Sequence, residues 1–330
     1  MTTVTRTVTR RILASMSVWL CALAFAPALA QGYPTKPIRL VVPFVAGGSS
    51  DALARAVAKQ LGDQLGGSVV VENRPGAGGT VASGAVARDT ADGYVLLFAT
   101  IGSHGISPAL YKQLPYQPVD DFTAITLLHR LPNVLIVTNE LPVTSVRDLI
   151  DYAKAQPGKL TFASAGNGSV SHLTGELFKS ATGIQIVHVP YKGGGAAMPD
   201  VISGRVSMMF ETSTLALTTA KSGKVRALAV TSPARWPAAP ELPTIAESGV
   251  ANFQVDSWTG LLAPAGLPRP IVEKLNEVMT RAASDPGYRD QMLKLGVEAV
   301  SSTPEEFRAF MQTEIAKWTR AVTASGARVD

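Results

Sequence analysis

The chain has 330 residues, of which 46% are hydrophobic and 17% charged, with a formal net charge of +5. This composition excludes intrinsic disorder, which requires low hydrophobicity and high net charge, and the length is sufficient for two domains. The sequence has no cluster of lysine and arginine with interleaved aromatic residues, so it does not indicate a nucleic-acid partner.

Residues 1–30 have the three parts of a secretory signal peptide. Arginines open the segment, an apolar run covers residues 12–25, and Ala28-Leu29-Ala30 is a typical cleavage motif. The apolar run is shorter than the ~20 residues that a helix needs to cross a bilayer. We therefore expect cleavage after Ala30 and localisation in the periplasm.

The predicted cleavage changes both the charge and the cysteine content. Removal of Arg6, Arg10 and Arg11 leaves 27 of the 30 basic residues against 25 acidic ones, a net charge of +2. The single cysteine, Cys21, lies in the removed segment. We therefore expect a mature chain without disulfides, thiol catalysis or Cys-ligated zinc.

The mature chain begins with apolar runs that alternate with amphipathic stretches, which predicts strands joined by helices around a largely parallel sheet. The first unit is a strand over residues 38–44, a glycine- and serine-rich turn, and a helix whose apolar residues recur at four-residue spacing. Further strands are predicted over residues 68–72 and 94–99, with a helix from Thr80 between them.

A long β-prone stretch, residues 122–138, is interrupted by Pro132 and is long enough to leave one sheet and enter another. A second α/β alternation follows it, and the strands predicted there are residues 160–164, 184–189, 206–211 and 225–230. We place the return crossover near residues 249–257 and expect a helical C-terminal part from Pro268 onwards.

The fold class predicted from this order is α/β, with two α/β domains joined by two crossovers and a ligand cleft between them. Domain 1 is discontinuous and comprises residues 31–131 and 250–330. Domain 2 comprises residues 132–249.

A strand, a glycine- or serine-rich turn and a helix N-terminus recur at residues 43–51, 75–80 and 164–172. The unpaired N–H groups and the positive dipole end of such a helix bind anions without a cationic side chain. In parallel sheets these turns lie at the carboxyl ends of the strands, where ligands bind. The first two turns belong to domain 1 and the third to domain 2, so closure of the cleft would bring two anion sites together, which suits a small dicarboxylate.

Four side chains near these turns are open to two interpretations. Asp51 either caps its helix or contacts the ligand. His172 and His104 either donate to a ligand oxygen or are satisfied, partly buried histidines. Glu211, at the end of a strand, either has a surface role or binds a ligand ammonium, hydroxyl or water.

The sequence does not favour an enzyme. A G-x-S-x-G motif and a phosphate loop are absent, and the sequence Gly166-Asn167-Gly168 has Ser171 where a dinucleotide fingerprint requires a third glycine. The four histidines do not have metal-ligand spacing. We therefore expect no catalytic residues, no cofactor and no metal site.

Six motifs follow one another along the mature chain: YPTKPI (33–38), VPFVAGGSSD (42–51), VENRPGAGG (71–79), SAGNGS (164–169), VPYKGGG (189–195) and SWTGLLAP (257–264). In this order they resemble the Bug-type solute-binding proteins of tripartite tricarboxylate transporters. The resemblance covers essentially the whole mature chain. It implies a periplasmic-binding-protein-like fold whose two domains close on a small carboxylate.

The resemblance also implies that the ligand is held mainly by backbone amides, small hydroxyls and waters. Together with the turns, it gives as candidate ligand-binding residues Phe44, Ala46, Gly47, Gly48, Ser49, Asp51, Gly78, Thr100, Ser103, Ser164, Gly166, Asn167, Gly168, Ser169, His172, Tyr191, Glu211 and Trp258. The family often has Asp at the position of Glu211, which leaves open whether the ligand is a di- or tricarboxylate, an amino-dicarboxylate or an aromatic carboxylate.

The partners implied by the resemblance are the carboxylate and the membrane permease subunits of the transporter, with the receptor itself a monomer. Two other functions stay open at this point. The protein could act as a ligand-dependent partner of a sensor protein, such as a sensor kinase, or as an exported enzyme.

Overall fold

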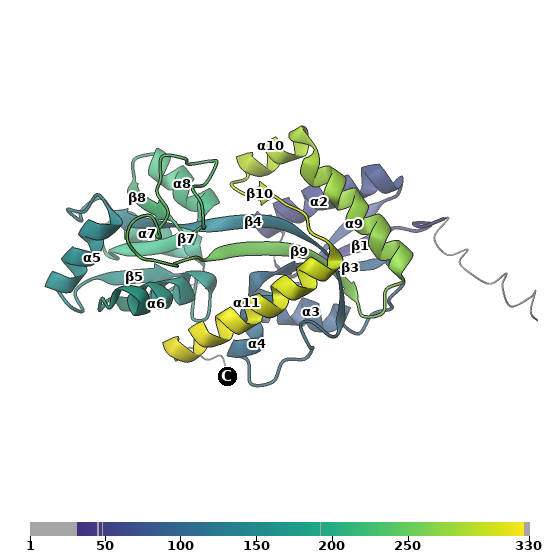
Figure 1. Cartoon of the computed structure of the whole chain (residues 1–330), viewed down its shortest axis with the longest axis horizontal. Helices are drawn as coiled ribbons and strands as arrows, with labels where there is room; N and C mark the ends of the chain where they lie inside the picture. The colour runs from purple at the N-terminus through teal and green to yellow at the C-terminus, as the bar shows by residue number, and fades with distance from the viewer. Residues whose placement is uncertain (1–31, 45, 48, 192, 327–330) are drawn as a thin grey trace, which may run out of the picture. The chain divides into compact units, whose positions relative to one another are not determined.

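The computed structural model of the chain (Figure 1) describes residues 32–44, 46–47, 49–191 and 193–326. The chain divides into two compact units, Met1–Thr35 and Lys36–Asp330. The predicted signal peptide, residues 1–30, lies outside the described residues. Every feature below belongs to the second unit.

Ten strands of the described residues form one continuously paired sheet in the order β2-β1-β3-β9-β4-β7-β5-β6, with β8 and β10 also paired to β4. The strands are β1 (Ile38–Val42), β2 (Val69–Asn73), β3 (Val95–Thr100), β4 (Phe122–Thr138), β5 (Thr161–Ser164), β6 (Val187–Pro190), β7 (Met208–Thr212), β8 (Val225–Val230), β9 (Asp256–Pro264) and β10 (Glu298–Ala299). Strands β1, β2 and β3 are parallel to one another, as are β5, β6 and β7. The predicted parallel α/β units are therefore present.

Strand β4 is a single 17-residue strand that joins two halves of this sheet. The first half contains β2, β1, β3 and β9, and the second half contains β7, β5, β6 and β8. Up to Pro132 it pairs with β9, and from Asn133 onwards it pairs with β7, with β8 pairing from Val134. The prediction of a long strand that enters a second sheet is confirmed, and Pro132 does not break it. The limits of the two predicted domains stay a prediction.

The helices alternate with the strands in the predicted order. They are α2 (Ser49–Leu65), α3 (Thr80–Val86), α4 (Ser107–Leu110), α5 (Val146–Ala155), α6 (Val170–Thr182), α7 (Gly194–Ile202), α8 (Ser213–Lys221), α9 (Arg269–Ser284), α10 (Pro286–Lys294) and α11 (Pro304–Ser325), with the short helical segments η1 (Ala77–Gly79) and η2 (Gly102–Ile106). The long helix α11 packs on η2 and α4 and also on α6, so it links the two halves of the sheet.

The second half of the sheet is buried on both faces. Phe162 on β5 joins a core cluster that includes Phe178 of α6, whereas its neighbour Ala163 joins a cluster that includes Val201 of α7 and Ala216 of α8. Successive residues of a strand point to opposite faces. Helices therefore cover both faces, as in other parallel sheets.

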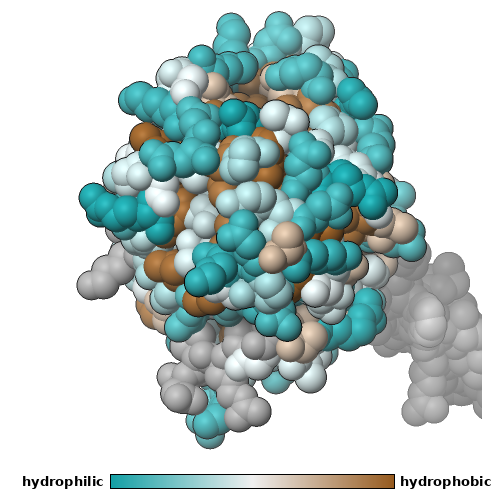
Figure 2. Space-filling model, turned by 90° about the vertical axis from the view of Figure 1, so that its left-hand side faces the viewer, coloured by the Kyte–Doolittle hydropathy of each residue, from teal (hydrophilic) through white to brown (hydrophobic). Residues whose placement is uncertain are grey.

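The surface is mainly polar on the side shown in Figure 2, where hydrophobic residues are scattered among hydrophilic ones. Single exposed apolar residues of this kind are normal in folded proteins. Within the described residues no helix has the length and apolar character needed to span a membrane.

Candidate functional site

The carboxyl ends of β5, β6 and β7 lie side by side, and each is followed by a helix. Ser164 at the end of β5 is in register with Pro190 of β6, and Ala163 is in register with Met209 of β7. Helices α6, α7 and α8 begin shortly after these strand ends. Three helix N-termini are thus gathered at one edge of the sheet, which is where α/β proteins bind their ligands.

The loop between β5 and α6 is held by its own small polar groups. The Ser164 hydroxyl accepts a hydrogen bond from the Gly166 N–H (3.1 Å), and the Ser169 hydroxyl donates to the Gly166 carbonyl (2.6 Å). Ser169 also caps α6 by accepting from the His172 N–H. Gly166 and Gly168 have φ values of 128° and 74°, a region that favours glycine. The predicted serines and glycines therefore shape one compact loop.

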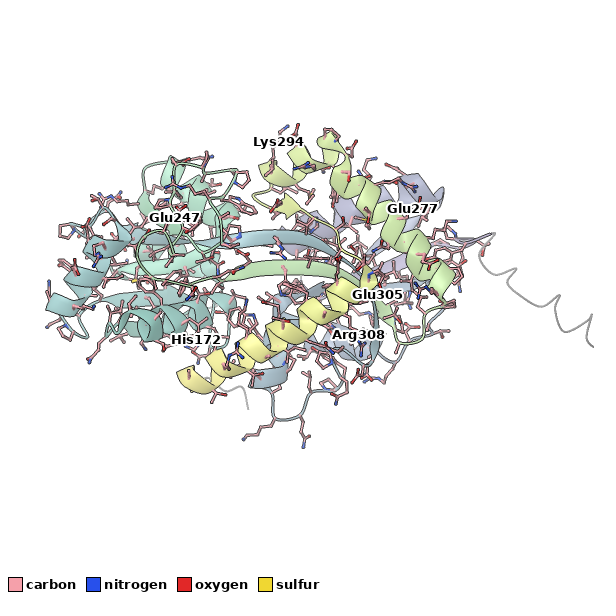
Figure 3. The ribbon with its side chains drawn as sticks, viewed as in Figure 1. His172, Glu247, Glu277, Lys294, Glu305 and Arg308 are labelled. Carbon is pink, nitrogen blue, oxygen red and sulfur yellow. The ribbon has the colours of Figure 1, made fainter. Side chains whose placement is uncertain are left out.

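Two stacked histidines lie beneath this loop. The ring centroids of His172 and His188 are 3.9 Å apart, with an angle of 16° between the planes. His172 Nδ1 accepts from the Gly168 N–H (3.0 Å), and His188 Nε2 lies 2.6 Å from the Ser164 hydroxyl oxygen. The prediction for His172 left two roles open, and its Nδ1 is occupied by the loop backbone. His172 lies near the start of α6 (Figure 3).

Both imidazoles are held in the neutral form. Burial is the main cause that lowers the pKa of His172, and burial is also the largest cause that lowers the pKa of His188 to about 4, with smaller electrostatic contributions from His172 and Lys179. A neutral His172 can accept the Gly168 N–H, whereas a protonated one cannot. The lowered pKa of His172 therefore favours the form that accepts the Gly168 N–H.

The segment that leads into α7 is tied to the same loop. The Tyr191 and Gly193 N–H groups donate to the carbonyls of Ser164 and Ala165, each at 3.1 Å. The Tyr191 hydroxyl donates to Asp200 Oδ2 (2.7 Å), so the ring is bound to a residue of α7. These bonds place the N-terminus of α7 directly beside that of α6.

Glu211 lies at the end of β7, where 6% of its surface is exposed. Its Oε1 accepts from the Thr212 N–H (2.8 Å) and the Thr212 hydroxyl (2.9 Å). Within the described part of the chain its Oε2 has no hydrogen-bond partner. Burial raises the pKa of this carboxyl group, and the Thr212 hydrogen bonds oppose the rise.

The turn after β1 is organised around Asp51, which is 4% exposed. Its carboxylate accepts from the Gly47 N–H (3.0 Å), Arg55 Nε (2.9 Å) and Asn73 Nδ2 (3.0 Å). The Arg55 hydrogen bond is the largest cause that lowers its pKa to about 2. Asp51 therefore shapes the turn through internal bonds, and Asn73 also donates to the Phe44 carbonyl (3.0 Å).

Other predicted residues of this turn are only partly described. Ala46 and Gly47 are exposed, Gly48 lies outside the described residues, and the side chain of Ser49 is not described. The predicted contacts of this turn with a ligand therefore stay a prediction.

The loop after β3 brings three further predicted residues together. Ser103 is fully buried, and its hydroxyl donates to the Thr100 carbonyl (3.1 Å) and lies 2.9 Å from His104 Nδ1. The Gly78 carbonyl oxygen lies 3.5 Å from the place that a Cβ on Gly102 would occupy. Gly78 therefore borders this loop, whereas the Ser103 hydroxyl is engaged inside the protein.

Trp258 and Asn167 are two predicted residues with opposite exposure. The Trp258 side chain is in the core, where its Nε1 donates to Glu314 Oε2 (3.1 Å) and its ring packs edge-on against Phe307 and Phe310. Its polar atom is therefore already used. Asn167, in contrast, is exposed on the loop before α6.

The loop before α6 also touches the other half of the sheet. A Cβ on Gly168 would lie 2.6 Å from Leu110 Cδ1, and Leu110 is the last residue of α4. The loop before α6 and helix α4, which follows β3, are therefore close in space, whereas the predicted pairing of this loop with the turn of residues 43–51 stays a prediction.

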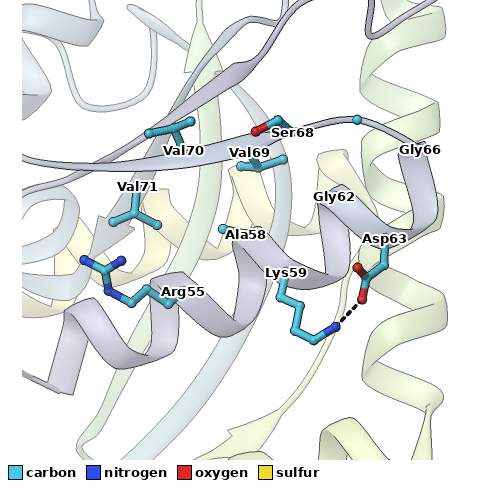
Figure 4. Close-up of a pocket in the computed structure, with 11 residues that line it drawn as sticks. Arg55, Ala58, Lys59, Gly62, Asp63, Gly66, Ser68, Val69, Val70 and Val71 are labelled. Atoms are coloured by element: carbon cyan, nitrogen blue, oxygen red, sulfur yellow. Dashed lines mark hydrogen bonds and ion pairs between the residues drawn. The ribbon is translucent and has the colours of Figure 1, made fainter.

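A groove of about 860 Å³ lies elsewhere, between α2 and the edge strand β2 (Figure 4). Arg55 and Lys59 line it from the helix, and Val69, Val70 and Val71 line it from the strand. It contains none of the predicted ligand-binding residues. Clusters of histidine, cysteine and acidic residues that could hold a metal ion are not found among the described residues.

Comparison with known proteins adds to this geometry. Residues 53–327 match the family model described as "Tripartite tricarboxylate transporter family receptor". Protein BugT of Bordetella pertussis is 36% identical over 97% of this chain and 98% of its own length.

Two solved structures are similar in both fold and sequence. Rpa4515 of R. palustris with adipate is 38% identical and covers 90% of this chain and 100% of its own, with a TM-score of 0.81. MatC from Rhodopseudomonas palustris with bound malate is 33% identical and covers 88% of this chain and 100% of its own, with a TM-score of 0.74.

Proposed function

The chain belongs to the tripartite tricarboxylate transporter receptor family, and from this premise we propose that its mature part binds a small carboxylate in the periplasm and delivers it to a membrane permease. The relatives with adipate and with malate support a small carboxylate as the ligand. Members of the family are solute receptors rather than enzymes, which supports a binding role without turnover.

The observation that carries this proposal is the pair of helix N-termini at the carboxyl ends of β5 and β6. In the described residues, the N–H groups of Val170 and Ser171 in α6 and of Gly194 and Gly195 in α7 have no hydrogen-bond acceptor. Unpaired N–H groups of a first helical turn and the positive dipole end bind carboxylates. The bonds that join the two segments hold these donors near one another.

We place the ligand between this pair and the turns of the other half of the sheet. Ser164, Gly166, Gly168 and Ser169 would form one wall, and Phe44, Ala46, Gly48 and Ser49 the other. The closeness of Gly168 to Leu110 of α4 supports this arrangement, because α4 follows β3 in the half of the sheet that carries the other turns. Closure of the two halves about β4 and β9 would then enclose the ligand.

Ligand binding is tested with the mature chain, residues 31–330, purified from the periplasm. Native mass spectrometry first detects any ligand retained through purification. A thermal-shift screen then uses aliphatic, amino and aromatic carboxylates, with NAD as a control of another class. At 100 times the Kd a ligand stabilises the folded state by ~2.7 kcal/mol, which raises the melting temperature by several degrees. If no carboxylate raised the melting temperature, the proposal would be contradicted.

Delivery needs a separate experiment. We expect deletion of the receptor to abolish uptake of the carboxylate that binds best, and re-expression of the receptor to restore it. Normal uptake after deletion, together with ligand-dependent binding to a sensor protein, would instead support a signalling role.

A further inference from the structure

We propose that Glu211 and the N-terminus of α7 form a subsite that selects carboxylates bearing a hydroxyl or ammonium group on the carbon next to a carboxylate. This inference rests on the proposed receptor function and names the class of ligand. It depends on two features that lie together in the described part of the chain: a buried carboxylate oxygen without a partner and an adjacent helix end whose first N–H groups have no acceptor there.

The acceptor of this subsite is Glu211 Oε2. The side chain is fixed because both donors of Thr212, the N–H and the hydroxyl, bind Oε1. Oε2 points at the first residue of α7, since a Cβ on Gly194 would lie 1.8 Å from it. Within the described residues nothing donates to Oε2, and a buried acceptor without a donor destabilises the protein. A donor on the ligand would remove this cost.

The donors of the subsite are the backbone N–H groups of α7. Gly193 bonds back to the Ala165 carbonyl, which leaves the N–H groups of Gly194 and Gly195 without an acceptor in the described part of the chain. Gly194 is half-buried and Gly195 is exposed, so the helix end is accessible. A carboxylate placed there would receive two N–H groups and the positive end of the helix dipole.

These two features together determine the selectivity. A ligand carboxylate at the start of α7 lies beside Glu211, and two carboxylates in contact repel each other. A hydroxyl or ammonium group on the adjacent carbon can donate to Oε2 and separate the two negative charges. A plain dicarboxylate has no such donor, so it leaves Oε2 unpaired and brings the negative charges together.

The experiment compares ligands that differ only at this carbon. Calorimetry at pH 7.5 measures the Kd of the mature protein for succinate, malate and aspartate, and for the longer pair adipate and 2-aminoadipate. We expect the best substituted ligand to bind at least ~10-fold more tightly than its plain counterpart, equivalent to about 1.4 kcal/mol. Malate and aspartate together distinguish a preference for hydroxyl from one for ammonium.

The variant Glu211→Gln tests the role of Oε2. Thr212 holds the oxygen at the position of Oε1, so the amide nitrogen takes the place of Oε2 and offers a donor where the wild type has an acceptor. The preference for the substituted ligand should fall to ~3-fold or less, with succinate binding unchanged or improved. Glu241→Gln, at an exposed carboxylate, is the matched control and should keep the wild-type preference.

Two more variants keep the test decisive. Glu211→Asp retains the charge but withdraws the carboxylate from Gly194, so it should also weaken the preference if Glu211→Gln fails to fold. Lys192→Ala tests the neighbouring cation, which lies outside the described residues, and should leave the preference intact.

The outcomes separate this inference from the receptor function. Equal Kd values for plain and substituted ligands in the wild type, or an unchanged preference in Glu211→Gln, would overturn the inference while leaving a carboxylate receptor. Loss of the preference in Lys192→Ala but not in Glu211→Gln would also overturn it. Binding of none of these carboxylates would contradict the proposed function itself.

Discussion

The free energy of unfolding of the protein falls between pH 7 and pH 5. Replacing His129 by glutamine should make this fall about 2 kcal/mol smaller. The His129 side chain is fully buried, with Nδ1 2.8 Å from the Thr259 hydroxyl oxygen and Nε2 2.9 Å from the Tyr288 hydroxyl oxygen. Burial lowers the pKa of His129 to about 3. The folded protein therefore keeps this ring neutral throughout the range.

The sign and size follow from the unfolded state. An unfolded histidine has a pKa of about 6.5 and takes up a proton as the pH falls below that value, whereas the folded one does not. The unfolded state thus binds more protons, and one such histidine costs about 1.9 kcal/mol of folding free energy between pH 7 and pH 5. This is a large share of the free energy of unfolding of a typical protein, ~5–15 kcal/mol.

Urea unfolding at pH 7 and pH 5 measures the effect as the difference between the two free energies of unfolding. Glutamine lowers stability at both pH values, so only this difference carries the prediction. The variant Tyr288→Phe is the control, because it removes a partner of His129 but not the titrating ring, and should keep the wild-type pH dependence. Burial raises the pKa of Asp256 to about 6, so its contribution to stability rises between pH 7 and pH 5, opposite to that of His129. Asp256 is present in all variants, so its contribution cancels in the comparison. The same pH dependence in wild type and His129→Gln would refute the reasoning.

Two further changes test the loop before α6. Ser169→Ala removes the helix cap and the bond to Gly166, so we expect ~1 kcal/mol lower stability by urea unfolding together with weaker carboxylate binding by calorimetry. Thr303→Ala removes the corresponding cap of α11 and should lower only the stability. If Ser169→Ala and Thr303→Ala lowered the affinity for the carboxylate equally, a role of the loop before α6 in binding would be contradicted. Gly168→Arg should abolish binding and displace Leu110, whereas Gly158→Arg, at the same φ of 74° but with nothing within 4 Å, should bind normally. Normal binding by Gly168→Arg would show that this loop is not part of the site.

The sequence predicts the backbone of the site better than its side-chain partners. The turn of Ser164 follows from local signals, because a strand, small residues and a helix cap are adjacent in the chain. His188, in contrast, reaches Ser164 only through the pairing of β5 with β6, in which it lies opposite Phe162. Single-sequence patterns do not determine such pairings, so His188 could not be recognised as a support of the loop.

Side-chain direction is likewise not determined by the local sequence. Trp258 lies in β9, where all nine residues are buried, so the alternation of polar and apolar residues that identifies the inner face of a strand is missing. The hydrogen bond from its indole N–H to Glu314, on the distant helix α11, fixes the direction of the side chain. The role of Asp51 follows more directly from the sequence, because an acidic residue in a first helical turn has few local roles.

The unbroken strand β4 imposes one register on both halves of the sheet. Its pairing with β9 already contains two register shifts, between Ala124 and Thr126 and between Leu127 and His129. A residue inserted between Pro132 and Asn133 would turn every later side chain to the opposite face unless a further bulge absorbed it. The same insertion would offset the ladders with β7 and β8 from that with β9. A length change that a surface loop tolerates would therefore require a further bulge in β4, so the two halves diversify their turns most easily while this strand keeps a constant number of residues.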